Sequence, residues 1–82
     1  MLKILFFAQL KETLDCGELE LQIGDMTRVS DVIQLLSEKS ETWKKALSAK
    51  RLMMAVNQDL VTPQSEIKDG DELAFFPPVT GG

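Results

Sequence analysis

The 82-residue chain contains no histidine and a single cysteine, Cys16. Without histidine it lacks the commonest general base and the commonest side-chain ligand of transition metals. One cysteine cannot form an intramolecular disulfide or a thiolate cluster for zinc or iron–sulfur, and this usage fits a reducing, cytoplasmic compartment. We therefore expect no bound metal, no bound cofactor and no conventional side-chain active site.

The chain also lacks long apolar runs and an excess of positive charge. No run approaches the roughly 20 residues that a membrane span needs, and the apolar opening, residues 1–8, is too short for a typical signal peptide. Nine Lys and Arg against thirteen Asp and Glu give a net charge of −4. Nucleic acids and anionic membranes are bound by an excess of basic residues, so we expect a cytoplasmic protein that binds neither.

Hydrophobic periodicity predicts a single small α+β domain. We expect strands over 2–8, 18–23, 52–56, 60–61 and 72–76, a helical turn over 9–14, a main helix from an N-cap at Thr27 to about Lys39, and a second short helix capped by Ser40. The first and last strands are the most apolar, which predicts central strands lying side by side, the first largely covered on both faces. This is the β-grasp, or ubiquitin-like, architecture: a mixed sheet packed on one main helix. Its predicted bounds are 1–76, with an extended flexible tail over 77–82.

The predicted tail consists of six residues with unusual physical properties: Pro77, Pro78, Val79, Thr80, Gly81 and Gly82. The prolines lack N–H donors and stop the sheet, the β-branched pair favours extended backbone, and the glycines leave a tip thin enough for a narrow channel. A terminal carboxylate needs activation before acyl chemistry, most simply as an acyl-adenylate made by a partner. Two final glycines alone would fit a frayed end, but the aromatics and prolines before them favour a carrier terminus.

Three segments resemble the small-subunit family of molybdopterin synthase, the ubiquitin-like sulfur carriers known as MoaD. They are residues 5–12 (Leu-Phe-Phe-Ala-Gln-Leu-Lys-Glu), 55–58 (Ala-Val-Asn-Gln) and 69–82, which ends in Phe-Phe-Pro-Pro-Val-Thr-Gly-Gly. The resemblance covers the whole chain and implies a β-grasp fold and a sulfur-carrier role. The sequence departs from the family near Lys11, where the family has arginine, so that a bidentate contact there would become a point-charge contact.

The resemblance also implies a mechanism and a set of partners. An ATP-dependent adenylating enzyme (MoeB-like) would activate Gly82, and a sulfur donor enzyme would supply the sulfur for a C-terminal thiocarboxylate. The tail would then enter the large synthase subunit (MoaE-like), within a heterotetramer, and deliver sulfur to cyclic pyranopterin monophosphate. ATP would be used by the activating partner, and this chain would be the non-catalytic, sulfur-donating subunit of a sulfurtransferase.

Phe7, Leu60 and Phe76 correspond to the apolar contact surface that the resemblance implies. Strand alternation places Phe7 and Phe76 on the more exposed faces of their strands, and Leu60 lies at a turn. A lone Phe or Leu is more often a core residue. Three of them on one sheet face would instead form a surface for a partner protein.

Three other functions remain open from the sequence. A related sulfur carrier could serve thiamine synthesis or tRNA thiolation, and the synthase that co-purifies would distinguish it. A ubiquitin-like protein modifier would form isopeptide conjugates with lysines. A plain interaction module would tolerate a C-terminal tag.

Overall fold

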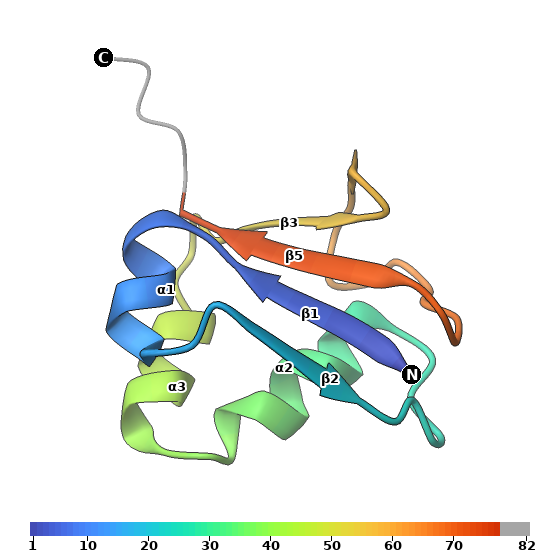
Figure 1. Cartoon of the computed structure of the whole chain (residues 1–82), viewed down its shortest axis with the longest axis horizontal. Coiled ribbons are helices and arrows are strands. Elements are labelled where there is room, and N and C mark those ends of the chain that lie inside the picture. The colour runs from blue at the N-terminus through green and yellow to red at the C-terminus, as the bar shows by residue number, and fades with distance from the viewer. Residues whose placement is uncertain (78–82) are drawn as a thin grey trace.

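The structure, a computed structural model, describes residues 1–77. Over this range five strands form one mixed sheet in the order β2-β1-β5-β3-β4, and three helices lie on one side of it (Figure 1). The strands are β1 (Leu2–Phe6), β2 (Glu18–Leu21), β3 (Met53–Val56), β4 (Asp59–Leu60) and β5 (Glu72–Phe76). The helices are α1 (Ala8–Leu14), α2 (Val29–Ser37) and α3 (Glu41–Leu47).

The two most apolar strands, β1 and β5, lie side by side in the middle of the sheet, as predicted. They pair in parallel, while β2 pairs antiparallel with β1 and β3 pairs antiparallel with β5. β4 pairs antiparallel with β3 at the edge of the sheet. The end of β5 therefore lies between two neighbouring strands.

The hydrophobic core lies between the helices and the inner face of the sheet. The inward side chains of the two central strands are at most 1% exposed: Leu2, Ile4, Phe6, Leu73 and Phe75. The helices and one loop contribute the facing residues: Leu10, Leu14, Val29, Val32, Leu36, Leu47 and Ile67. The Phe6 ring stacks on Phe75 at a centroid distance of 5.9 Å and meets Trp43 edge-on at 5.3 Å. These aromatic contacts support the sheet under the C-terminal end of β5.

The prediction that the first strand is largely covered on both faces holds fully for its inner face and in part for its outer face, the face of Lys3 and Phe7 that alternation predicts to be the more exposed. Lys3 and Leu5 of β1 are half-buried, whereas the side chains on the opposite face of the strand are fully buried. All three helices of the described chain pack on the inner face (Figure 1), so the outer face is covered only by neighbouring side chains of the sheet. An apolar run usually indicates burial on both faces, but here its outer residues belong to an uncovered sheet surface.

Several element boundaries also differ from the prediction. The helical turn expected over 9–14 is a seven-residue helix that begins at Ala8, so β1 ends at Phe6, and β2 ends at Leu21. α2 is capped by Arg28 instead of Thr27, because the Asp31 carboxylate turns back and accepts N–H bonds from both residues, at 2.9 and 3.0 Å. These two backbone bonds lower the pKa of Asp31, that from Thr27 most strongly.

Ser40 is the N-cap of α3, as predicted. Its hydroxyl oxygen accepts the backbone N–H of Trp43 at 3.3 Å, which satisfies one of the donors that a helix N-terminus leaves free. The cap fixes the start of the helix that packs Trp43, which is partly buried, against the core. None of the helices within residues 1–77 is both long and apolar enough to cross a membrane.

Candidate functional site

The base of the predicted tail lies at the end of β5. Pro77 is the only predicted tail residue that the structure describes, and the predictions for Pro78, Val79, Thr80, Gly81 and Gly82 lie outside the described residues. Pro77 borders a hollow of ≈ 180 Å³ together with Leu10 of α1 and Ala46 of α3. The described chain therefore ends beside the junction of two helices.

The end of β5 is held from both sides. Phe75 lies opposite Phe6 of β1 in the parallel register, and the backbone N–H of Phe7 donates to its carbonyl at 3.2 Å. On the other side Met53 lies opposite Phe76. Because Phe75 is also fully buried in the core, any tail beyond residue 77 starts from a fixed point.

A row of apolar residues crosses the outer face of the sheet. Leu5 lies opposite Ala74, which lies opposite Ala55 on the next strand, and Ala55 in turn lies opposite Leu60. Ala55 is 7% exposed although its register places it on the outer face, and it lies outside the contacting cluster of core residues. The two alanines leave a low surface between the larger residues at either end of the row.

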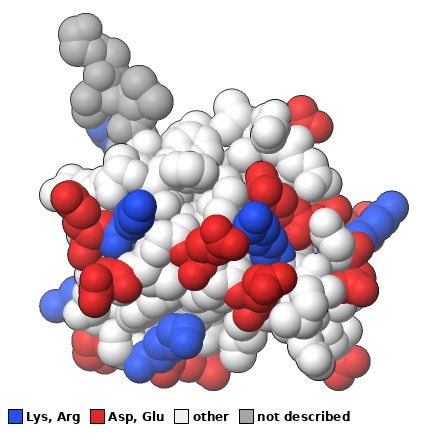
Figure 2. Space-filling view, viewed as in Figure 1, with Lys and Arg blue, Asp and Glu red and all other residues white. Residues whose placement is uncertain are grey.

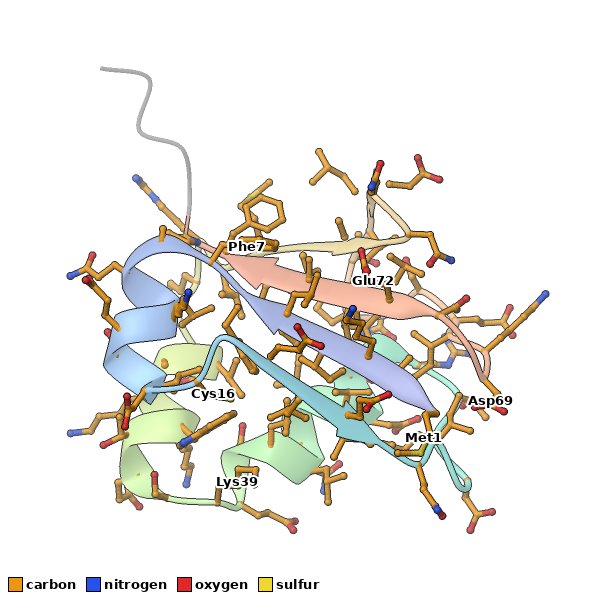
Figure 3. All side chains as sticks on the ribbon, in the orientation of Figure 1. Met1, Phe7, Cys16, Lys39, Asp69 and Glu72 are labelled. Atoms are coloured by element: carbon orange, nitrogen blue, oxygen red, sulfur yellow. The ribbon has the colours of Figure 1, made fainter. Side chains whose placement is uncertain are left out.

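A second row lies next to the first, toward the C-terminal end of β5. Met53 and Phe76 face each other across β3 and β5, and Phe7 lies beside the end of β5 (Figure 3). Phe7 is 47% exposed and Leu60 is 68% exposed, while Phe76 is half-buried. The structure thus brings the three predicted contact residues to one face, and their role in partner binding stays a prediction. We call the two rows together the outer apolar face: Leu5, Phe7, Met53, Ala55, Leu60, Ala74 and Phe76.

Charged residues border the outer apolar face on one side. Lys3 lies opposite Glu20 on β2 and Glu72 on β5, and its Nζ atom is 3.5 Å from the Glu18 carboxylate. This pair is exposed, and exposed ion pairs contribute roughly 0–1 kcal/mol to stability. Figure 2 shows charged side chains of both signs across the middle of the view and an uncharged region in its upper middle part. Three carboxylates around one ammonium give this border a net negative charge.

Cys16 lies away from the candidate site. It is located in the turn after α1, at the opposite end of that helix from Phe7 (Figure 3), and its thiol donates a weak bond to the Glu18 carbonyl at 3.5 Å. Residues 1–77 contain no group of three or more His, Cys, Asp or Glu side chains placed to hold a metal ion.

Sequence reasoning missed four members of the outer apolar face: Leu5, Met53, Ala55 and Ala74. Leu5 shares the parity of Phe7, and Ala74 shares that of Phe76, so alternation alone could have found these two. Met53 and Ala55 needed the register of β3 against β5, which a single sequence does not contain.

Comparison with known proteins gives the family of the chain. The model of the ThiS family matches residues 4–82. The chain belongs to the ThiS family. Over all 82 residues of both chains it is 43% identical to the molybdopterin synthase sulfur carrier subunit of Haemophilus influenzae and 44% identical to that of Escherichia coli. The resemblance seen in the three sequence segments is therefore confirmed over the full length.

Solved structures confirm the β-grasp fold. The putative molybdopterin converting factor subunit 1 from Pyrococcus furiosus matches with a TM-score of 0.77 at 28% identity, covering 95% of this chain and 97% of that one. The small archaeal modifier protein 1 from Methanosarcina acetivorans matches with a TM-score of 0.79 at 26% identity, covering 99% and 95%. A chain in the complex of subunits 1 and 2 of the Helicobacter pylori molybdopterin-converting factor matches at 0.69 with 24% identity, covering 99% and 97%, and shows the fold alone.

Proposed function

We propose that this chain is the sulfur carrier subunit of a molybdopterin synthase. The observation that carries the proposal is the full-length identity of 43% and 44% to two curated sulfur carrier subunits. The match to the family model extends through Gly82, so the similarity includes the residues that would carry the sulfur. A fixed β5 end leading directly into the tail supports the same function.

In this proposal the reactive group is the main-chain carboxylate of Gly82. A carboxylate is a poor electrophile, so an adenylating partner must first join it to the AMP part of ATP: a carboxylate oxygen attacks the α-phosphorus and pyrophosphate leaves. Hydrosulfide supplied by a donor enzyme then attacks the carbonyl carbon and displaces AMP from the acyl-adenylate, which leaves a thiocarboxylate. ATP is thus a substrate of the partner, and the carrier needs no side-chain catalyst for its own part.

Delivery uses the tail and the outer apolar face in different ways. The tail, residues 77–82, enters the large synthase subunit and presents its sulfur to cyclic pyranopterin monophosphate. The outer apolar face binds the surface of that subunit and supplies most of the affinity, because exposed Phe and Leu side chains gain most from being removed from water. The two curated relatives are named as subunits of a synthase, which supports an arrangement with a second subunit.

Intact mass spectrometry tests the proposed chemistry. The purified chain is incubated with the activating enzyme, ATP and a sulfur source, and we expect a mass gain equal to the exchange of one oxygen for sulfur. Fragmentation should locate the gain at Gly82, and a variant lacking Gly82 serves as the control that should stay unchanged. An unmodified wild-type mass under conditions that modify a known carrier would contradict the proposal.

A second candidate function is that of a protein modifier. The observation that favours it is the 26% identity to a small archaeal modifier protein with the same fold. This function predicts that Gly82 forms isopeptide bonds with lysines, seen as higher-mass bands that persist under denaturation and disappear when Gly82 is deleted. Sulfur transfer without such bands would reject it.

A further inference from the structure

The most exposed residue of the outer apolar face stands on the least supported strand. Leu60 belongs to β4, which has two residues and pairs only with β3. One further backbone bond, from Val61 N–H to the Met54 carbonyl at 3.1 Å, follows the strand. An edge strand this short has few ladder bonds of its own, so the position of Leu60 depends on the turn that precedes it.

That turn is tied to β5 by the side chain of Asn57. Asn57 and Gln58, the two central residues, have φ values of 50° and 74°, as a two-residue type I′ hairpin requires. The Asn57 Oδ1 atom accepts the Glu72 backbone N–H at 3.0 Å, and the backbone N–H of Asn57 donates to the Glu72 carbonyl at 2.8 Å. The regular β3–β5 register ends at Val56 opposite Leu73, so Asn57 extends the contact between the strands by one step.

Asp71 completes the link on the side of β5. Its Oδ1 atom accepts from Asn57 Nδ2 at 3.0 Å, and its Oδ2 atom accepts the Lys68 backbone N–H at 2.8 Å. Each carboxylate oxygen therefore has one donor, and the bonds connect the 68–71 turn to the hairpin turn. Hydrogen bonds to a charged acceptor are stronger than neutral ones, which makes this connection stiffer than one ordinary ladder bond.

We propose that Asn57 and Asp71 are positioning residues that hold the Leu60 hairpin in the geometry which the large synthase subunit binds. The inference rests on the proposed function, because it assumes that this partner docks on the outer apolar face. The two residues act through Leu60, because their side chains make hydrogen bonds within the chain. Removing these hydrogen bonds frees the hairpin to move relative to β5. A mobile Leu60 must be ordered at binding, and that ordering lowers the affinity.

The Asn57→Asp variant tests the link with little change in shape. Aspartate tolerates positive φ, and the new carboxylate can still accept from Glu72. It cannot donate to Asp71, and it places two like charges at hydrogen-bond distance. We expect the Kd for the large subunit to rise roughly tenfold, which corresponds to the loss of one charge-assisted hydrogen bond.

The double variant Asn57→Asp/Asp71→Asn is the matched rescue. The exchange restores all three side-chain bonds with the middle one reversed, because the new amide donates to the new carboxylate and its oxygen still accepts from Lys68. The net charge equals that of the wild type. We expect the Kd to return to within about threefold of the wild-type value.

The Leu60→Ala background separates positioning from general weakening. If Asn57 acts through Leu60, the Asn57→Asp change should raise the Kd less than about twofold once the leucine side chain is gone. Asn57→Gly, which keeps the positive φ without the side chain, gives an independent second variant. Urea unfolding of every variant confirms that the protein is folded under the binding conditions.

The outcomes are distinguishable. A wild-type chain that fails to bind the large subunit would reject the proposed function itself. Normal wild-type binding with no effect of Asn57→Asp and Asn57→Gly, or with the same loss in the presence and absence of the Leu60 side chain, would overturn the positioning role alone.

Discussion

The two faces of the same sheet carry similar side chains in opposite environments. On the inner face Phe6 and Phe75 stack in the core and are at most 1% exposed. On the outer face Phe7 is 47% exposed and Phe76 is half-buried. Each inner phenylalanine is followed directly in the sequence by its outer counterpart, so one strand alternation produces both faces.

The difference separates residues needed for folding from residues available for binding. Burying the inner side chains stabilises the domain, because each removes a large apolar area from water. The outer side chains leave much of their area in water within the isolated chain, and they recover this free energy only when a partner covers them. The outer apolar face is therefore the part of the molecule for which we propose binding to the large synthase subunit.

The largest expected effect is a difference in stability between two single variants at adjacent positions, one on each face of the sheet. Phe75→Ala should lower the free energy of unfolding by about 3–5 kcal/mol, since it removes a fully buried ring and leaves a cavity. Phe76→Ala should change stability by less than about 1 kcal/mol but weaken binding to the large subunit. Urea denaturation and titration calorimetry measure the two quantities. Equal destabilisation by both variants would remove the distinction between the faces.

A smaller effect, on binding to the large subunit, should distinguish the exposed leucine of the outer apolar face from an exposed leucine elsewhere. Leu60→Ala should raise the Kd for the large subunit roughly tenfold or more, as expected for an apolar anchor, with stability changed by less than about 0.5 kcal/mol. Leu35 on α2 is 44% exposed on the helical side, so Leu35→Ala is the matched control. If the two variants weaken binding equally, the partner does not select the outer face.

The smallest effect is acid sensitivity, which should arise away from the outer apolar face. The pKa of Asp31 is lowered by N–H bonds from Thr27 and Arg28, and that of Asp69 by its hydrogen bond with the Met1 ammonium group. A carboxyl group whose pKa in the folded protein lies below its ordinary value of 3.8 stabilises the fold at pH values above 3.8. This stabilisation is lost as the pH falls through the pKa of the folded state. Thermal unfolding against pH should therefore show wild type and Asp31→Asn converging below pH 3.8. A constant difference would contradict the role of the carboxylate.

The strands and the faces of their side chains could be predicted from the sequence, because alternation is a pattern among neighbouring residues. The parity of β1 and β5 placed Phe7 and Phe76 on the outer face. Ser40 could be identified as a cap because capping is a local interaction: its partner, Trp43, is only three residues away. Thr27 was preferred as the cap of α2 because its hydroxyl is a common capping group. The Asp31 carboxylate, on the following turn, takes both backbone donors instead.

The features that were missed depend on contacts between distant segments. Ala55 and Ala74 join the outer apolar face only through the β3–β5 register. An alanine in the sequence does not itself indicate that it belongs to a binding surface. Asn57 and Asp71 are fourteen residues apart, and their pairing follows from the hairpin and the 68–71 turn meeting beside β5.

In the proposed function the domain binds the large synthase subunit and Gly82 carries the sulfur. The most direct test compares the wild type with a variant lacking Gly82, each after activation with ATP and a sulfur source, for molybdopterin formation and for affinity to the large subunit. We expect the deletion to abolish product formation while the Kd for the large subunit stays within about threefold of the wild-type value, because in this proposal the outer apolar face supplies most of the affinity. Product formation by the deletion variant, or a loss of binding as large as the loss of product, would contradict it.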